Sequence, residues 1–165
     1  MVGKVGSYSL RSISVDESKS IMPARDIYHN NLKNALIKDQ WTITHDPLRL
    51  IWGNKDMYVD LGAEKILKAE KLGIKIAVEL KTFGGKSEVN DLEDALGQYF
   101  LYYSVIKRRE SERTLYLAIQ NKVFLDIFEN DLGKLILEDY QIPLIVFSIK
   151  EEVILQWIPK NPIVN

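Results

Sequence analysis

The chain of 165 residues is short enough for one domain, and its 46% hydrophobic and 27% charged content is typical of a globular protein with a real core. A formal net charge of −1 argues against a protein whose main task is to coat nucleic acid, although it is compatible with a nuclease that contacts DNA locally. The absence of cysteine excludes disulfides and fits a reducing, cytoplasmic location, and two histidines are too few for a His-rich zinc site.

The first segment, residues 1–21, has weak periodicity, and we expect a flexible extension before a single domain of residues 22–159 and a tail of residues 160–165. No apolar run approaches the roughly 20 residues of a membrane helix, so no membrane partner is expected. From residue 24 to residue 40 apolar side chains such as Leu32 and Leu36 recur at helical spacing, which predicts the first helix.

Strands are predicted next, at residues 41–44, 48–52 and 57–61, the last two around a turn at Gly53-Asn54. The following segment, residues 62–72, is ambiguous. Its apolar residues among Glu and Lys suggest a short helix, whereas the alternative is that Asp60 ends a strand and the segment leads directly into the next one.

The stretch from Ile74 to Phe83 is apolar and partly β-branched, is bounded by glycines, and is predicted to be a strand. Glu79 and Lys81 stand two residues apart and therefore project from the same face of it. A β-hairpin would bring Asp60 beside Glu79. Two carboxylates and an ammonium group suit Mg²⁺ or Mn²⁺ and a phosphate, because hard cations take oxygen ligands and can activate water. The alternative is an inert Glu–Lys pair at a strand end.

The C-terminal half predicts a helix that starts near Ser87 and Asn90, the two candidates for its N-cap, and runs to about Lys107, with Gln98 and Tyr102 on one face. Apolar runs at residues 114–119 and 143–149 are typical of buried parallel strands. A helix over residues 123–140 with a break near 130–133, and a last strand at 153–158, complete the chain. The fold class is therefore α/β, with a central mixed sheet, helices on both faces and the acidic site at strand ends.

This order of elements, with Asp60 followed by E-x-K at residues 79–81, resembles the restriction-endonuclease-like fold of the PD-(D/E)xK nuclease superfamily. The resemblance implies that Asp60, Glu79 and the Leu80 carbonyl hold the metal and that Lys81 orients the attacking water. Val59 stands where the superfamily's motif has a proline.

Other positions match the superfamily more loosely. Gln98 and Tyr102 resemble its Q-x-x-x-Y element, in which the glutamine positions the lysine or contacts DNA. Asp26 and His29 are the candidates for the accessory residue that some members carry on the leading helix. The tryptophans are expected in the core or at an interface, and the basic run at residues 107–109 is expected to be a solvated turn.

A more specific resemblance lies in DIYHN at residues 26–30, WTITHDPL at 41–48, YVDLGAEK at 58–65, AVELKTF at 77–83 and ALGQY at 95–99. These segments are similar to the XisH family, the fdxN element excision controlling factors, over about residues 22–159. Membership implies a role in programmed excision of a DNA element beside a site-specific recombinase and the companion factor XisI.

Three functional hypotheses follow. The first is a Mg²⁺-dependent DNA endonuclease or nicking activity that uses Asp60, Glu79 and Lys81. The second is a non-catalytic accessory protein that binds XisI, the recombinase or DNA on a nuclease scaffold, because a controlling role does not by itself imply cleavage. The third is a toxin–antitoxin-like pair in which XisI restrains this chain. The oligomeric state, a homo-oligomer included, is left open.

Overall fold

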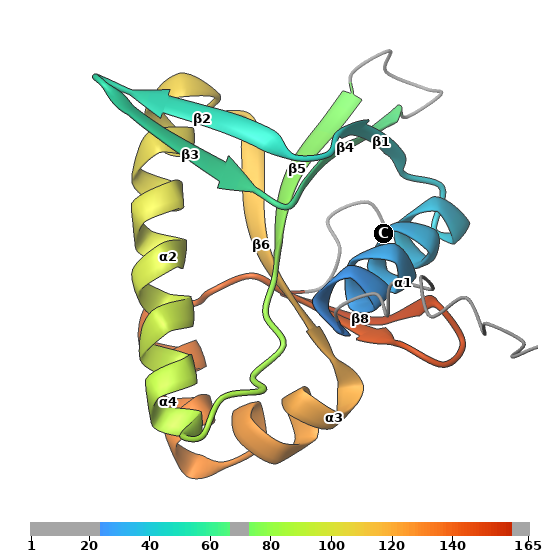
Figure 1. Ribbon diagram of the computed structural model, residues 1–165, viewed down its shortest axis with the longest axis vertical. Coiled ribbons are helices and arrows are strands. Elements are labelled where there is room, and N and C mark those ends of the chain that lie inside the picture. The colour runs from blue at the N-terminus through green and yellow to red at the C-terminus, as the bar shows by residue number, and fades with distance from the viewer. Residues whose placement is uncertain (1–23, 67–72, 160–165) are drawn as a thin grey trace, which may run out of the picture.

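The computed structural model describes residues 24–66 and 73–159, which form a mixed α/β fold around a six-stranded sheet (Figure 1). The helical elements are α1 (Ala24–Lys38), α2 (Glu88–Arg109), α3 (Asn121–Val123), the π-helical turn η1 (Phe124–Phe128) and α4 (Asp131–Tyr140). The strands are β1 (Thr42–His45), β2 (Leu48–Trp52), β3 (Lys55–Val59), β4 (Leu61–Ile66), β5 (Gly73–Leu80), β6 (Arg113–Gln120), β7 (Leu144–Ser148) and β8 (Val153–Ile158). The expected extension and tail, residues 1–21 and 160–165, lie outside the described residues.

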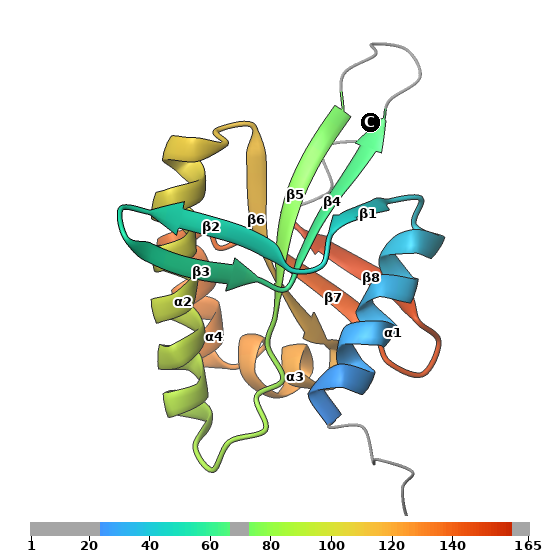
Figure 2. The same ribbon diagram turned by 45° about the horizontal axis from the view of Figure 1, so that its top comes forward.

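The large sheet has the strand order β1-β4-β5-β6-β7-β8. Its centre, β5, β6 and β7, is parallel, and the pairs β1–β4, β4–β5 and β7–β8 are antiparallel. The predicted mixed sheet is therefore confirmed. Strands β2 and β3 form a separate hairpin, turned at Gly53 with a φ of 59°. This hairpin reaches from the start of β4 toward the C-terminal end of α2 (Figures 1 and 2).

Side chains alternate strictly across the central strands, which gives the sheet two buried faces. Along β6, Leu115, Leu117 and Ile119 belong to the hydrophobic cluster under α2, whereas Tyr116 and Ala118 belong to the cluster under α1. The period-two pattern of an extended chain explains why the apolar run of β6 is continuous rather than alternating. Helices on both faces, as predicted, cover these two clusters.

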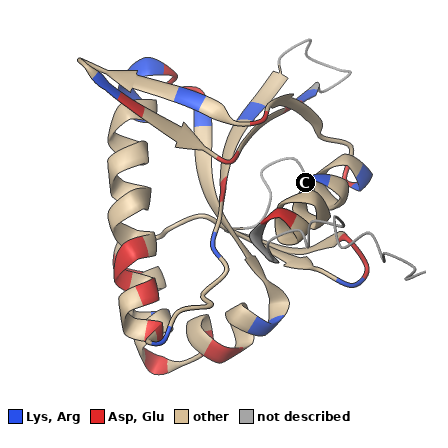
Figure 3. Ribbon diagram, in the orientation of Figure 1, with Lys and Arg blue, Asp and Glu red and all other residues tan. Residues whose placement is uncertain are grey.

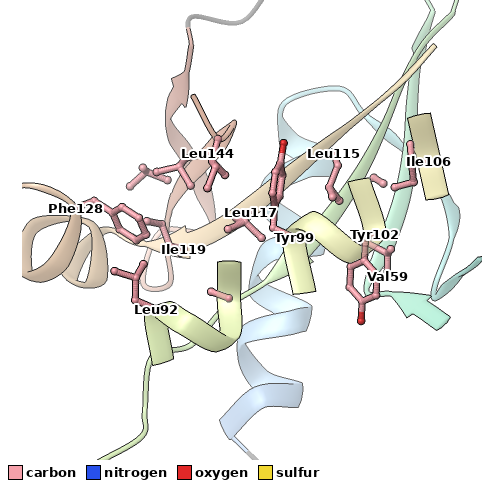
Figure 4. Close-up of a cluster of buried hydrophobic side chains, with 14 of the residues drawn as sticks. Val59, Leu92, Tyr99, Tyr102, Ile106, Leu115, Leu117, Ile119, Phe128 and Leu144 are labelled. Atoms are coloured by element: carbon pink, nitrogen blue, oxygen red, sulfur yellow. The ribbon is translucent and has the colours of Figure 1, made fainter. Parts of the chain in front are cut away.

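The cluster under α2 also anchors the β2–β3 hairpin. Leu48 and Leu50 of β2 and Val59 of β3 are buried in it, and Figure 4 shows Val59 beside Tyr102 of α2. On the other face of the sheet Trp41 is only 3% exposed, and its ring centroid lies 5.6 Å from that of Trp157. The expected core role of these two tryptophans is confirmed, whereas Trp52 on the hairpin is 47% exposed.

Of the two alternatives for residues 62–72, the short helix is wrong for residues 62–66, which form most of β4. Leu61 and Ala63 are fully buried, and β4 pairs with β1 on one side and β5 on the other. Burial between two strands overrides the helical propensity of the Ala, Glu and Lys residues in this segment. The expected turn at residues 107–109 is also wrong, because these residues form the last turn of helix α2. In the described part of the chain no helix combines the length and apolar character needed to cross a membrane.

Candidate active site

Strand β5 and the residue that follows it present Glu79 and Lys81 to the α2 face of the sheet. Ile76, Val78 and Leu80 pack in the α1 cluster, so the alternate positions Glu79 and Lys81 point the other way. The antiparallel β4–β5 register pairs Leu61 with Val78, which places Asp60 opposite Glu79 at the next step. Asp60 and Glu79 therefore lie side by side, as expected from a hairpin. The strand that pairs with β5 is β4 rather than β3.

Asp60 and Glu79 are fixed by hydrogen bonds that cross between their two chain segments. The backbone amide of Asp60 donates to Glu79 Oε2 at 3.1 Å, and the backbone amide of Leu80 donates to Asp60 Oδ2 at 2.8 Å. Glu79 is only 2% exposed, and Asp60 is partly buried. Each carboxylate therefore has a defined orientation before any ligand arrives, which is the preorganisation that a reactive site needs.

Lys81 completes a compact group of charges. Its Nζ lies 3.5 Å from Glu79 Oε1 and also donates to Gln98 Oε1 on α2, and its side chain is 16% exposed. Gln98 is placed by α2, whose start is capped by Ser87 Oγ accepting from the Asn90 amide at 3.3 Å. The structure therefore brings together Asp60, Glu79, Lys81 and Gln98, four of the residues that the sequence singled out.

Two hollows share the segment Thr82–Gly84, which follows β5, and Lys81 lines one of them. One, of about 380 Å³, is lined by Leu80, Lys81, Thr82, Phe83, Gly84, Gly85, Asp91, Asp94 and Gln98. The other, of about 350 Å³, is lined by Tyr28, Thr82, Phe83, Gly84, Glu88, Gln120, Lys122, Val123, Asp126 and Ile127. A substrate chain at Lys81 thus has open space in the first of these hollows, whereas Asp60 and Glu79 are not among the lining residues of either.

Some of these lining residues escaped the sequence analysis. Asp91 accepts from the Gly85 amide at 2.9 Å and so closes the Gly84-Gly85 turn against α2. The glycine pair followed by an acidic helix start was a usable signal for this loop. Tyr28 and Lys122 come from distant elements, α1 and α3, and no local pattern indicates that they meet the Thr82–Gly84 segment.

The accessory candidates lie elsewhere. His29 Nε2 is 2.8 Å from Asp46 Oδ1, and Lys33 Nζ donates to Asp46 Oδ2 at 2.6 Å, so α1 is tied to the β1–β2 turn. Asp26 is exposed in the first turn of α1. Tyr102 is a buried member of the α2 cluster and is not among the residues that line the 380 Å³ hollow at Lys81.

The pKa values of two groups, Asp46 and Tyr99, are shifted by their surroundings. Partial burial acts to raise the pKa of Asp46, but the hydrogen bonds from Lys33 and His29 outweigh it, and the net shift is downward. Burial, with a smaller contribution from Tyr103, raises the pKa of Tyr99 to about 12. Tyr99, the neighbour of Gln98 in sequence, therefore remains a neutral phenol at physiological pH and is unsuited to act as a general base.

The oxygen donors at this site fit a small hard cation. Within residues 24–66 and 73–159 no group of three or more His, Asp or Glu side chains surrounds a common point. Mg²⁺, however, usually takes one or two protein carboxylates and keeps several waters. Asp60 and Glu79 supply such a pair, and the Leu80 carbonyl belongs to the residue between Glu79 and Lys81.

Comparisons with known proteins agree with one another. The family model of the XisH protein matches residues 22–155. A solved XisH family protein from Nostoc punctiforme is 36% identical, with a TM-score of 0.72, over 81% of this chain and 99% of that one. A solved fdxN element excision controlling factor protein from Anabaena variabilis is also 36% identical, with a TM-score of 0.73 and the same coverage. A search of curated proteins finds no match.

Proposed function

The chain belongs to the XisH family, and from this premise we propose that it is a controlling factor for programmed DNA excision that carries a metal-dependent DNA endonuclease site. The excision role follows the name of the similar Anabaena variabilis protein. The nuclease site is the group formed by Asp60, Glu79 and Lys81, with Gln98 as its support. On this proposal the chain has the restriction-endonuclease-like fold, which agrees with the order of its helices and strands.

One observation carries the nuclease proposal. The buried carboxylate of Glu79 accepts from the Asp60 amide, the partly buried carboxylate of Asp60 accepts from the Leu80 amide, and an ammonium group lies 3.5 Å from Glu79. Burying charges is costly, and a hydrophobic replacement often stabilises a protein equally well. A charged group of this kind, whose Lys81 lines one of the hollows, is therefore better explained by chemistry than by stability.

The roles divide among the chain's own groups. Asp60, Glu79 and the Leu80 carbonyl would hold Mg²⁺ or Mn²⁺. When bound, that ion would supply positive charge to the phosphate and lower the pKa of a water molecule. Lys81 is positioned to orient that water or a phosphate oxygen, and Gln98 accepts from its ammonium group and limits its rotation. Glu79 Oε1 lies 3.5 Å from the Lys81 ammonium group and balances its positive charge.

The partners of this proposal are DNA, a site-specific recombinase and an XisI-like companion. DNA would enter along the Thr82–Gly84 segment, where Lys122, which pairs with Asp126, is one cation that would meet a phosphate. The near-neutral net charge of −1 suggests that local contacts, or the partners, supply most of the affinity.

The experiment is a nicking assay on supercoiled and linear DNA in Mg²⁺ or Mn²⁺, with and without the XisI-like companion. Wild type is compared with Glu79→Gln, Lys81→Met and the matched surface variant Glu138→Gln, whose position is exposed on α4. The expected result is metal-dependent cutting by wild type and Glu138→Gln only.

The opposite result has a definite meaning. If wild type makes no cut under any of these conditions, and folded Glu79→Gln and Lys81→Met proteins still support excision in cells, the nuclease proposal fails. The chain would then act as a non-catalytic accessory that binds its partners on this scaffold.

A further inference from the structure

Helix α2 leaves most of one side uncovered by the rest of the described chain. Its buried residues are Leu92, Ala95, Tyr99, Tyr102, Val105 and Ile106. The opposite side carries exposed residues at helical spacing, namely Glu93, Asp94, Gly97, Phe100, Leu101, Ser104, Lys107 and Arg108. Phe100 and Leu101, at its centre, are 40% and 53% exposed. We call these eight residues the outer face of α2.

The borders of the outer face are defined by neighbouring elements. On one side the ring of Phe100 meets that of Tyr140 in α4 at 5.5 Å. On the other side the Arg109 guanidinium lies 5.3 Å from the ring centroid of Trp52 on the β2–β3 hairpin. Figures 1 and 2 show α2 along the border of the molecule, with the hairpin near its C-terminal end. The uncovered surface is thus one strip along the helix.

Gly97 is the feature of this strip that intrachain packing does not explain. A Cβ atom added at Gly97 would meet nothing within 4 Å. Glycine inside a helix costs about 1 kcal/mol relative to alanine, so an exposed helical position ordinarily favours another residue. Small residues at such positions allow another helix to approach closely, and Ser104 is a second small residue on the same strip.

Charge along the strip is graded. Acidic Glu93 and Asp94 stand toward the start of α2, whereas basic Lys107 and Arg108 stand in its last turns, and Figure 3 shows the acidic bands in the first half of the helix. None of these four forms an ion pair with another residue of the described ranges: Arg108 donates to the Ser104 carbonyl at 3.1 Å, and Lys107 lies 5.6 Å from the Tyr103 ring centroid. The helix dipole favours this gradient but explains neither Gly97 nor the exposed apolar centre.

The strip is complementary to itself when it is reversed. All its members pair symmetrically about the point between Phe100 and Leu101: Glu93 with Arg108, Asp94 with Lys107, Gly97 with Ser104, and Phe100 with Leu101. A two-fold axis at that point would set acid against base at both ends, small against small, and apolar against apolar. Isologous interfaces have this property, in which residue i contacts residue j and j contacts i.

We propose that the outer face of α2 is a homodimer interface, in which α2 packs antiparallel on α2 of a second copy about a two-fold axis between Phe100 and Leu101. The paired strip from Glu93 to Arg108 spans roughly 22 Å. The second copy is favoured over nucleic acid because the acidic half of the strip would repel phosphates, whereas it matches the basic half of another copy.

The proposed dimer also affects the 380 Å³ hollow at Lys81, which we call the Lys81 groove. Asp94 lines that groove, and in the dimer it faces Lys107 of the partner subunit. Each subunit would therefore place a cationic helix end at the rim of the other's groove, where it can meet a phosphate chain. This consequence rests on the nuclease function proposed above, whereas dimerisation does not.

The test is the mass of the full chain in solution by analytical ultracentrifugation from roughly 1 to 100 μM, the range in which modest interfaces are measured. Wild type is expected to associate to twice its 19.0 kDa mass. Arg108→Glu, which sets two like-charge pairs in the dimer, is expected to weaken the dimer about tenfold, and the swap Glu93→Arg with Arg108→Glu should restore it. Lys150→Glu, on an exposed turn, is the charge control and should leave the dimer unchanged.

Gly97→Leu is a second test, in which dimer affinity and the stability of the monomer should change differently. It should weaken the dimer at least tenfold while the melting temperature of the monomer does not fall, because the new side chain meets nothing within the subunit. A wild-type chain that stays monomeric throughout overturns the proposal. So does a dimer indifferent to both Arg108→Glu and Gly97→Leu, or a monomer that binds duplex DNA through Arg108 without rescue by the charge swap.

Discussion

Asp60 and Glu79 hold each other through the backbone: the Asp60 amide donates to Glu79 Oε2 at 3.1 Å, and the Asp60 carboxylate accepts from the amide that follows Glu79 at 2.8 Å. On the nuclease proposal, the two acids therefore serve both the structure and the chemistry. An amide side chain can accept the same backbone hydrogen bonds but lacks the negative charge that a cation needs. This difference allows fold and metal binding to be tested separately.

The first prediction concerns metal affinity. Asp60→Asn and Glu79→Gln should fold with melting temperatures near that of wild type but should lose the stabilisation that Mn²⁺ gives. A ligand at 100 times its Kd adds about 2.7 kcal/mol, and each kcal/mol raises the melting temperature of a domain this size by roughly 2–4 °C. Thermal denaturation with and without MnCl₂ measures the effect. An equal Mn²⁺ shift in Glu79→Gln and wild type would show that the ion binds elsewhere.

The second prediction concerns Gln98 as a positioning residue. Gln98→Ala removes the acceptor of the Lys81 ammonium group and should reduce the nicking rate by about tenfold, the order of a misplaced catalytic group. Gln98→Glu keeps an acceptor oxygen and should retain more activity than Gln98→Ala. A structural role alone would lower the melting temperature of both variants without this ranking of rates, so rates and melting curves are measured on the same samples.

The third prediction concerns acid stability. The pKa of Asp46 is lowered in the folded state by Lys33 and His29, so its contribution is fully present above the unfolded value of about 3.9 and is lost as pH falls through the lower folded value. Wild type should exceed Asp46→Asn in unfolding free energy at neutral pH, and the difference should shrink as pH falls below about 4. Urea titrations at several pH values measure it. Lys33→Met should reduce the same difference, and a gap that grows with acidity would contradict the assignment.

The fourth prediction concerns the packing of α4. A Cβ atom at Gly133 would overlap the Ile127 carbonyl and the Phe128 backbone, which belong to η1. Gly133→Ala must therefore push α4 away from η1 and should destabilise the protein by about 1–3 kcal/mol, the usual cost of overpacking. Gly84→Ala is the matched control, because its Cβ meets nothing within 4 Å. Equal denaturation midpoints for the two variants would refute this packing.

Much of the fold was predictable because the central strands are extreme in composition. The runs at residues 114–119 and 143–149 are strands β6 and β7, and the Ser87 cap begins α2 as expected. The helix over residues 123–140 exists but is interrupted at Glu129 and Asn130, between the π-helical turn η1 and α4. Nothing in local propensity distinguishes a π turn from an α turn there.

Long-range placement is what the sequence could not supply. The alternation of Glu79 and Lys81 predicts a shared side but not which helix covers that side, and α2 with Gln98 could be placed only by the fold. His29 was a reasonable candidate by composition, yet its partner, Asp46, lies 17 residues away and ties it to a turn. Trp52 remains half-exposed because the hairpin extends past the body of the cluster that buries Leu50.

The nicking rate of supercoiled DNA in Mn²⁺ tests the central claim most directly, with wild type and Glu79→Gln at equal concentration and equal folded fraction. Our account predicts that wild type nicks the plasmid and that the loss of one charge at Glu79 lowers the rate by at least a hundredfold, on the order of other essential electrostatic groups. Equal rates for the two proteins would mean that any cleavage arises from a contaminant or another site, and the assignment of Asp60, Glu79 and Lys81 would be wrong.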